Sequence, residues 1–345
     1  MKPYDLMNFE ALGAEAGHIE EEIVKAQAEG LLSKDYKYLI TGDNLQTYLA
    51  AHPDTVLPDI ITTKTHSVPP ADYIANGKKK SIVTRSAGYD HLEHLQSVAN
   101  ITSLREYCVN AVAETAVKLL FCAAGNLNQY TANTALFERD KCVSFRELSG
   151  CKATVFGMGK IGSRICRMLQ GMGLETRAVD IRSGLTPPEG IRLISKEEAA
   201  DSQVVICAMN YTADPGSRFY NKNYFTEEYL SRFPKGLVFI NVTRGEIAPE
   251  EALLKLYEQG HIFGLGLDVF ENEAEVARLL REAPDSSRAA IRIIRAALDR
   301  RENFYVQAHQ GFNSDKAALC KAVETVKHLE DYYKGGFQSQ LPYYL

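Results

Sequence analysis

The chain has 345 residues, of which 45% are hydrophobic and 24% are charged, and its formal net charge is −5. This length exceeds that of one typical hydrophobic core, so the sequence predicts two domains. The negative balance argues against nucleic acid as a partner. No apolar run is long enough to span a membrane, which argues against a membrane protein.

The cysteines and histidines form no recognisable site. Seven cysteines are scattered without a CxxC pair, which is typical of reduced thiols and not of a disulfide framework or a zinc site. His91 and His94 are three residues apart, but no further ligand pattern accompanies them, so we expect no bound metal. The chain begins without an apolar signal-peptide core. We therefore expect a cytoplasmic protein.

The first hundred residues predict a small α/β unit. A helical pattern covers 10–29, and strand-like apolar runs occur at 37–41, 59–63 and 81–85. The segment 109–127 is apolar on nearly every face, which predicts a mostly buried helix.

From about residue 149 to about residue 308, predicted strands alternate with predicted helices. This alternation is typical of βαβ units, in which helices cover both faces of a parallel sheet. The expected strands are 153–156, 175–179, 203–208, 237–241, 263–267 and 304–308, and the expected helices are 160–172, about 196–200, 222–232 and 249–259. A last helix is expected at about 314–333.

The segment 275–301 is rich in arginine. Seven arginines alternate there with alanine, isoleucine and leucine, and 287–300 predicts an amphipathic helix. Three interpretations stay open: a solvated helix packed on one side, an anion-binding lid, or an oligomer contact.

A glycine-rich turn follows the expected strand 153–156. Its glycines lead directly into a helical pattern, and Asp180 ends the next expected strand. In a GxGxxG turn the glycines permit a tight turn, a close approach of backbone amides to a pyrophosphate, and close helix–strand packing. A carboxylate at position 180 accepts both ribose hydroxyls of NAD and repels the 2′-phosphate of NADP, although Arg182 follows closely. The sequence thus predicts NAD as the cofactor, held by Gly157, Gly159, Lys160, Ile161, Gly162 and Asp180.

Polar residues follow three successive strands of the same predicted sheet. Arg244 follows 237–241, Asp268 and Glu273 follow 263–267, and His309 follows 304–308. Ligands of parallel sheets bind beyond the carboxyl ends of the strands. Histidine exchanges a proton near neutral pH, a carboxylate beside it fixes its tautomer, and a guanidinium clamps a carboxylate substrate. Together with a dinucleotide site, these residues predict hydride transfer.

At these residues the chain resembles the D-isomer-specific 2-hydroxyacid dehydrogenase family, in particular its D-lactate dehydrogenase-like members. The resemblance covers roughly residues 60–334 and is carried by four motifs. They are Arg-Ser-Ala-Gly-Tyr-Asp-His-Leu at 85–92, Tyr-Cys-Val-Asn-Ala-Val-Ala-Glu at 107–114, Asn-Val-Thr-Arg-Gly at 241–245, and Leu-Asp-Val-Phe-Glu-Asn-Glu at 267–273.

The resemblance implies an α/β fold with two Rossmann-like or flavodoxin-like domains, each with a doubly wound parallel sheet. The NAD-binding domain would be 109–320, inserted into a substrate domain built from 1–108 and 321–345. Substrate would bind in a cleft that closes by hinge motion. The helix starting at Val109 would cross between the domains, and a homodimer is expected.

The resemblance also implies residue roles and an activity. His309 would be the catalytic acid and base, Glu273 its partner, and Arg244 the catalytic and substrate-binding arginine. The amides of Ala87 and Gly88 and the side chain of Tyr107 would bind substrate, while Thr243 and Asp268 would contact the cofactor. The implied reaction is the NAD-dependent interconversion of a small 2-oxo acid and its D-2-hydroxy acid.

The chain differs from the family pattern at several positions, so the pattern does not specify the substrate. Ala308 stands where the family often has proline, Ala208-Met209-Asn210 replaces His-Val-Pro, and Cys108-Val109 replaces Ser-Pro. Two alternatives remain. The same fold and site could oxidise a non-carbon acid such as phosphite or reduce a bulkier 2-oxo acid. A protein of another class, a dinucleotide-sensing corepressor, could share the fold.

Overall fold

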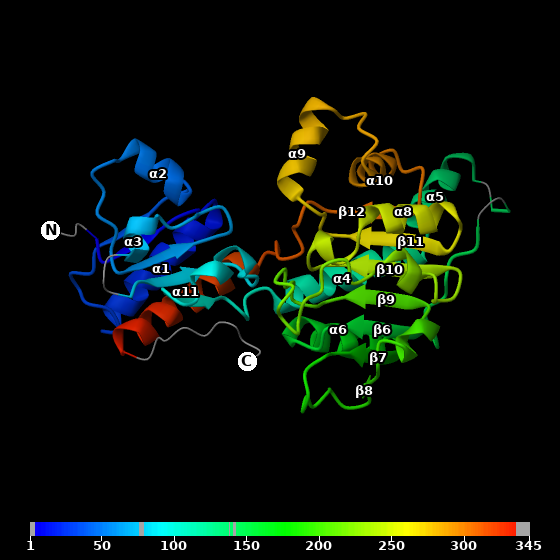
Figure 1. Cartoon of the computed structure of the whole chain (residues 1–345), viewed down its shortest axis with the longest axis horizontal. Helices are drawn as coiled ribbons and strands as arrows, with labels where there is room; N and C mark the ends of the chain where they lie inside the picture. Colours follow the sequence, from blue (N-terminus) through cyan, green and yellow to red (C-terminus); the bar gives the residue numbers. More distant parts are fainter. Residues whose placement is uncertain (1–3, 76–78, 138, 141–142, 336–345) are drawn as a thin grey trace. The chain divides into compact units, whose positions relative to one another are not determined.

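The computed structural model describes residues 4–75, 79–137, 139–140 and 143–335, in two compact units (Figure 1). The first unit is Met1–Cys108 with Asn313–Leu345, and the second is Val109–Phe312. The return to the first unit therefore comes after residue 312, where the sequence suggested 320. Cys142 and the aromatic tail from 336 onward lie outside the described residues.

The first unit contains a five-stranded parallel sheet in the order β2-β1-β3-β4-β5. This is the flavodoxin-like order, which confirms the expected fold. Two of these strands, β1 and β5, were not predicted, because the first has only three residues and the second is mostly polar. The strands are β1 (Leu6–Asn8), β2 (Tyr38–Ile40), β3 (Ile60–Thr63), β4 (Ser81–Thr84) and β5 (Asn100–Ser103).

Segments from both ends of the chain pack together in the first unit. Helix α1 (Ala14–Ala28) lies against α11 (Ala317–Tyr333). Their buried apolar side chains, including Ile19, Ile23 and Val326, belong to one core cluster. Burial of this shared face is the reason that the chain returns to the first unit. Shorter helices are α2 (Leu45–Ala51), α3 (Ala71–Ala75) and the 3₁₀ helix η1 (Asp90–Leu95).

The second unit contains a seven-stranded parallel sheet in the order β12-β11-β10-β9-β6-β7-β8. This is the Rossmann order with one further strand, and its strand order reverses between β6 and β9. All six predicted strands are present, and only the two-residue β8 was missed. The strands are β6 (Lys152–Phe156), β7 (Glu175–Val179), β8 (Arg192–Leu193), β9 (Val204–Cys207), β10 (Leu237–Asn241), β11 (Ile262–Leu267) and β12 (Phe304–Val306).

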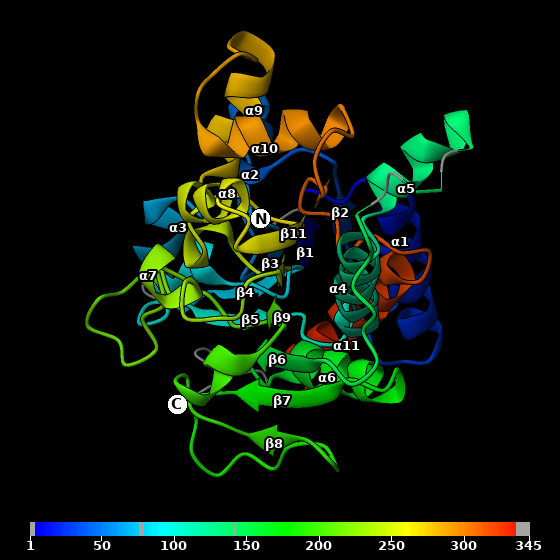
Figure 2. The same ribbon diagram turned by 90° about the vertical axis from the view of Figure 1, so that its right-hand side faces the viewer.

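Helices cover both faces of this sheet (Figure 2). Helices α4 and α6 pack together on one face, and α7, α8 and α10 form a layer on the other. The helices are α4 (Val109–Ala124), α5 (Leu127–Asn133), α6 (Lys160–Gly171), α7 (Glu227–Leu230), α8 (Glu250–Glu258), α9 (Glu273–Glu282) and α10 (Ala289–Leu298), with 3₁₀ turns η2 (Thr134–Leu136), η3 (Glu198–Asp201) and η4 (Gly245–Ile247).

Several predicted helices were longer than the observed ones. The segment 109–127 is helical only to Ala124, because Asn126 adopts a left-handed conformation with φ 45°. The helix expected at 222–232 begins only at Glu227, because the Thr226 side chain accepts a hydrogen bond from the Tyr229 N–H and caps the first turn. Among the described residues, no helix is long and apolar enough to cross a membrane.

A buried ionic cluster holds α1 to the sheet of the first unit. Glu15 accepts a hydrogen bond from Arg85 Nε at 2.9 Å, and Lys64 Nζ and Lys321 Nζ lie 2.5 and 3.6 Å from its other oxygen. Arg85 is 0% exposed. Burial alone would raise the pKa of Glu15, but Arg85, Lys321 and Lys64 together hold it below its ordinary value.

We expect Glu15→Gln to lower the free energy of unfolding of the first unit by about 3–5 kcal/mol, because it leaves buried cations without their carboxylate. Urea unfolding at neutral pH measures this, with Glu20→Gln on the exposed side of α1 as the control. Since the folded-state pKa is depressed, the contribution is present above the ordinary pKa of 4.5 and is lost as pH falls through the folded value. Equal unfolding midpoints for the two variants would contradict this role.

Candidate active site

The turn between β6 and α6 requires glycine at two positions. Gly157 has φ 96°, and a Cβ there would lie 2.6 Å from the carbonyl oxygen of Ala208. A Cβ on Gly162 would lie 1.8 Å from the carbonyl oxygen of Gly157. Because Ala208 follows β9, this contact joins the two strands at which the strand order reverses. A dinucleotide binds at that point of a Rossmann sheet.

The amino end of α6 is open toward a ligand. Helix α6 begins at Lys160 after Gly159, and nothing lies within 4 Å of the position that a Gly159 Cβ would take. Lys160 is exposed and Ile161 half-buried in the first helical turn. The backbone N–H groups of a first helical turn, together with the helix dipole, bind phosphate. The turn therefore fits the pyrophosphate of a dinucleotide.

Asp180 ends β7 beside the glycine turn. Its Oδ2 accepts hydrogen bonds from the Met158 N–H and from Arg182 Nη2, both at 2.7 Å. Its Oδ1 accepts from the N–H and the Nε of Arg182, both at 2.9 Å. Burial opposes the charge, but these donors hold the pKa of Asp180 below its ordinary value. Asp180 is therefore ionised, and Arg182 forms an ion pair with it.

A buried asparagine shapes the turn that carries Arg244. Asn241 Oδ1 accepts hydrogen bonds from the N–H and the hydroxyl of Thr243, at 3.1 and 3.0 Å. Its Nδ2 donates to the Arg244 carbonyl at 2.9 Å. Thr243 also lies near Cys207, with 3.3 Å between Oγ1 and Sγ. Asn241 was not among the predicted site residues, although asparagine at the end of a strand is a known turn-forming signal.

Asp268 holds the turn that carries His309. Its carboxylate accepts hydrogen bonds from the N–H groups of Gln310 and Gly311, both at 2.9 Å, and its carbonyl accepts the His309 N–H at 2.7 Å. His309 has φ 52°, which is left-handed. Such a conformation costs on the order of 1 kcal/mol and persists only where the surroundings enforce it. Burial raises the pKa of Asp268, against the effect of the two N–H donors.

The three predicted catalytic side chains meet at the carboxyl edge of this sheet. His309 Nδ1 donates to Glu273 Oε2 at 2.9 Å, and its Nε2 lies 3.5 Å from Arg244 Nη1. Because the carboxylate keeps the proton on Nδ1, Nε2 is the atom that exchanges a proton with a ligand. The His309 side chain is 35% exposed, so a ligand from solvent can reach it.

The first unit contains the other predicted substrate residues. Ala87 and Gly88 lie on the loop after β4, and Tyr107 lies between β5 and α4. The carbonyls of Gly88 and Ala87 accept hydrogen bonds from Ser86 Oγ and Ser103 Oγ, at 2.7 and 3.3 Å. Within the described part of the chain, the N–H groups of Ala87 and Gly88 donate no hydrogen bond. Tyr107 lies under Lys321, with Nζ 4.8 Å from the ring centroid, and burial raises its pKa well above 10.0.

Comparison with known proteins decides the family. A family model described as D-isomer specific 2-hydroxyacid dehydrogenase, NAD binding domain, matches residues 117–311, more than half of the chain. The chain belongs to this family. The match confirms both the resemblance inferred from the motifs and the expected cofactor, NAD.

Individual relatives agree with this family. The chain is 26% identical over 273 residues to D-3-phosphoglycerate dehydrogenase 2 of Arabidopsis thaliana, covering 76% of this chain and 39% of that protein. It is 25% identical over 212 residues to D-lactate dehydrogenase of Treponema pallidum, covering 59% of this chain and 61% of that protein. These alignments thus span less than two thirds of either relative.

The fold is shared over nearly the whole length of a solved structure. D-lactate dehydrogenase from Aquifex aeolicus, complexed with NAD and lactic acid, superposes with a TM-score of 0.76 at 22% identity. The superposition covers 96% of each chain. At this identity the likeness shows the fold, and the roles of single residues depend on the geometry above.

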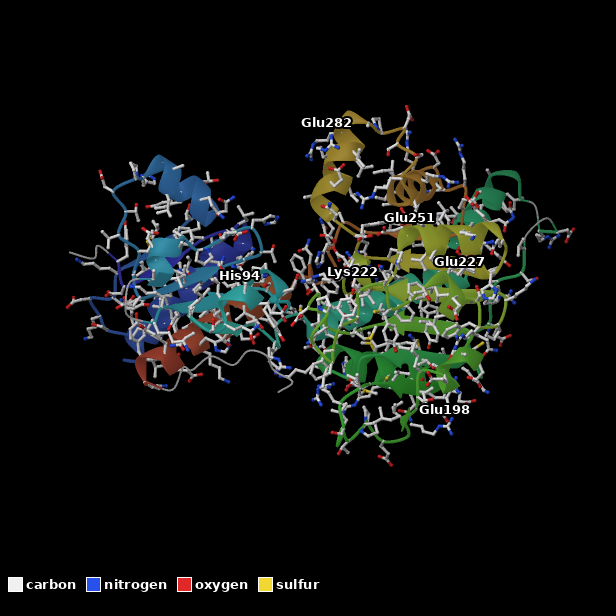
Figure 3. All side chains as sticks on the ribbon, in the orientation of Figure 1. His94, Glu198, Lys222, Glu227, Glu251 and Glu282 are labelled. Atoms are coloured by element: carbon white, nitrogen blue, oxygen red, sulfur yellow. The ribbon has the colours of Figure 1, made fainter. Side chains whose placement is uncertain are left out.

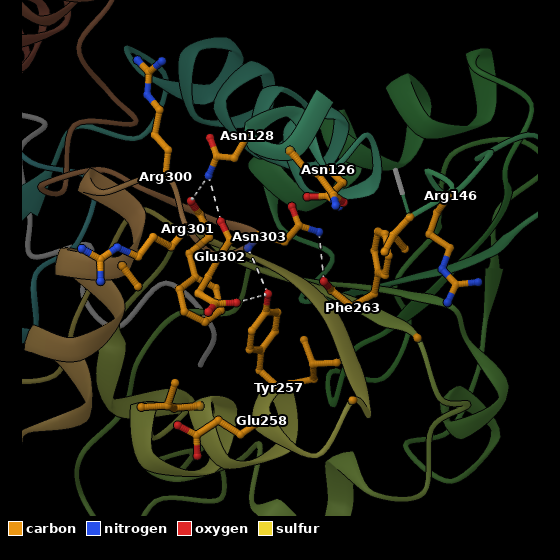
Figure 4. A pocket seen from close by; sticks show the side chains of 18 of the residues that line it. Asn126, Asn128, Arg146, Tyr257, Glu258, Phe263, Arg300, Arg301, Glu302 and Asn303 are labelled. Carbon is orange, nitrogen blue, oxygen red and sulfur yellow. Dashed lines mark hydrogen bonds between the residues drawn. The ribbon is translucent and has the colours of Figure 1, made fainter. Parts of the chain in front are cut away.

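A cavity of the second unit lies away from these residues (Figure 4). It has a volume of about 890 Å³ and is lined by Gly236, Ile262 and Asn303, which stand at the amino ends of β10, β11 and β12. Arg244 and His309 follow the carboxyl ends of strands in the same sheet. The cavity therefore contains none of the predicted site residues.

The described residues contain no group of three His, Cys, Asp or Glu side chains suited to a metal ion.

We expect Gly162→Ala to weaken NADH binding at least tenfold, because its methyl group forces α6 away from the Gly157 carbonyl and disturbs the phosphate-binding amides. Fluorescence titration with NADH measures this. Gly171→Ala is the matched control, since nothing lies within 4 Å of its Cβ position at the other end of α6. Equal NADH affinity of both variants would disprove the close-packing role of Gly162.

Proposed function

We propose that this dehydrogenase interconverts a small 2-oxo acid and the corresponding D-2-hydroxy acid. The observation that carries the proposal is the placement of His309 between Glu273, at 2.9 Å, and Arg244, at 3.5 Å. This arrangement gives one proton-exchanging nitrogen and one guanidinium on the same side of a NAD-binding sheet. Relatives named as lactate and phosphoglycerate dehydrogenases support the substrate class.

In the reducing direction, bound NADH supplies the hydride to C2 of the substrate. Arg244 binds the substrate carboxylate and polarises the keto oxygen. His309 Nε2 donates its proton to that oxygen as negative charge develops there, and Glu273 stabilises the protonated imidazole before the transfer. In oxidation, His309 Nε2 accepts the hydroxyl proton, and the same contacts act in reverse.

The remaining predicted residues are assigned to binding. The N–H groups of Ala87 and Gly88 hold the substrate carboxylate, and Tyr107, which is neutral, offers a hydroxyl. In this proposal, Asp180 accepts the ribose hydroxyls, and Thr243 and Asp268 contact the cofactor. The family match favours neither phosphite oxidation nor a corepressor-like role.

The main test is His309→Ala. We expect turnover of 2-oxo acids to fall by roughly 10²–10⁴-fold, because the proton donor is lost, while NADH affinity stays unchanged, because the glycine turn is intact. Initial rates and NADH titration measure the two effects. The control is His261→Ala. His261 directly precedes β11, at the amino edge of the sheet, and its ring lies near the Leu230 carbonyl. Near-normal turnover of His309→Ala would overturn the assignment.

We further propose that the protein is a cytoplasmic homodimer. The six described cysteines are free thiols, which suits a reducing compartment. Several large apolar side chains of the second unit are exposed on α4 and on the segment that follows it before β6, and exposed apolar groups of this kind are typical of protein interfaces. They are Phe121, Leu127, Tyr130, Phe137, Val143 and Phe145.

Phe137, which is 89% exposed, tests the dimer. Light scattering after gel filtration should give twice the chain mass for the wild type. We expect Phe137→Asp to raise the dimer dissociation constant by more than tenfold, because a buried charge replaces an apolar contact. Leu298→Asp, at an exposed site on α10, is the control. A monomeric wild type would refute the proposal.

A further inference from the structure

The loop between β11 and α9 carries Glu273, and its backbone sets where that carboxylate points. Glu273 is the first residue of α9, and Asn272 caps the helix in a left-handed conformation with φ 51°. The Glu273 side chain is 43% exposed, so surrounding side chains do not enclose it. Its Oε1 lies 3.4 Å from the Phe270 N–H, within the same loop. The orientation of Glu273 toward His309 therefore depends on the loop backbone.

One residue of this loop, Glu271, is held at both of its backbone polar groups. Its N–H donates to Glu250 Oε1 at 2.7 Å. Its carbonyl accepts a hydrogen bond from Arg288 Nη2. Glu250 stands in the first turn of α8 and is only 2% exposed, while Arg288 directly precedes α10 and is half-buried. Two elements distant in sequence thus fix the backbone on either side of one side chain.

A glycine contact ties this loop to the turn of Arg244. A Cβ on Gly245 would lie 1.9 Å from both the Glu271 nitrogen and the Phe270 carbonyl carbon. The loop therefore rests directly on Gly245, the residue after Arg244. The Asn272 N–H also donates to Glu246 Oε1 at 3.3 Å. Any displacement of the loop would change the position of Glu273 relative to Arg244.

The charges around Glu250 and the loop also bear on this contact. Burial raises the pKa of Glu250 to about 7, and the Glu251 and Glu271 carboxylates act in the same direction, while the Glu271 N–H opposes them. Lys222 Nζ lies 3.8 Å from the Glu271 side chain (Figure 3). A buried carboxyl without a hydrogen-bond donor would be costly, and the Glu271 N–H is the donor that Glu250 has in this loop.

We propose that Glu250 and Arg288 are positioning residues, which hold the Glu271 backbone and thereby aim Glu273 at His309. Because Glu273 is the partner of His309 only in the proposed function, this role depends on that assignment. This role also gives the arginine-rich segment 275–301 a function. Arg288, which directly precedes α10, donates a hydrogen bond to the loop that carries Glu273. In this role both residues act through the loop backbone and not by contact with the substrate.

The test compares Glu250→Ala, Glu250→Gln and Arg288→Met, each alone and combined with Glu273→Gln. We expect Glu250→Ala to lower kcat/KM roughly 10- to 100-fold, since small displacements of a catalytic group have effects of this size. Glu250→Gln retains a hydrogen-bond acceptor and should recover most activity. Combined with Glu273→Gln, Glu250→Ala should have little further effect, because both changes remove the same interaction.

A pH profile of kcat/KM gives a second readout. We expect Glu273→Gln and Glu250→Ala to change the profile in the same way, because both changes act on the contact between Glu273 and His309. Arg281→Ala, at an exposed position on α9, should leave the profile unchanged. NADH affinity and the thermal unfolding midpoint are measured for every variant.

The outcomes separate the two proposals. An unchanged kcat/KM in Glu273→Gln would refute the proposed role of Glu273 itself. If Glu273→Gln lowers kcat/KM but Glu250→Ala and Arg288→Met leave it unchanged, the positioning role is wrong. The role is also wrong if either change lowers kcat/KM further when it is combined with Glu273→Gln. If Glu250→Ala does not fold, Arg288→Met decides alone, because Arg288 is half-buried and methionine keeps its aliphatic length.

Discussion

The hydrogen bonds of Asp268 are the interaction on which the rest of the site depends. They hold His309 in a left-handed conformation that a non-glycine residue adopts only under constraint. From that conformation, Nδ1 reaches Glu273 and Nε2 reaches Arg244. Each of these partners stands at the end of a different strand, so the parallel sheet brings them to one edge. Asp268 is buried, and its carboxylate oxygens accept hydrogen bonds from backbone N–H groups, which cannot rotate away as side chains can. The turn that carries His309 is therefore held in place.

Much of this was predictable because it depends on short-range patterns. The glycines at 157, 159 and 162 and the polar residues after β10, β11 and β12 could be found by spacing alone. A parallel sheet then dictates that strand ends meet. Strand β1 escaped prediction because it has only three residues, and β5 because it is mostly polar. Asn241 was visible in its motif, but its turn-shaping role follows only from the bonds that it makes.

Contacts between distant segments were not predictable. Glu250 and Arg288 meet at Glu271, and nothing in the spacing of these residues indicates that they share a backbone partner. The same holds for Glu15, Arg85 and Lys321, which join both ends of the chain within the first unit. Such polar groups would be costly if left unpaired. Their pairing adds to the apolar packing of α1 against α11, which joins the two chain segments of the first unit.

The configuration of the product decides whether the proposed reaction is right. The purified protein should be incubated with NADH and a panel of small 2-oxo acids, and the products separated on a chiral column. We expect NADH to be consumed in step with formation of the D-2-hydroxy acid. Formation of the L enantiomer, or tight NADH binding without reduction of any acid in the panel, would contradict it.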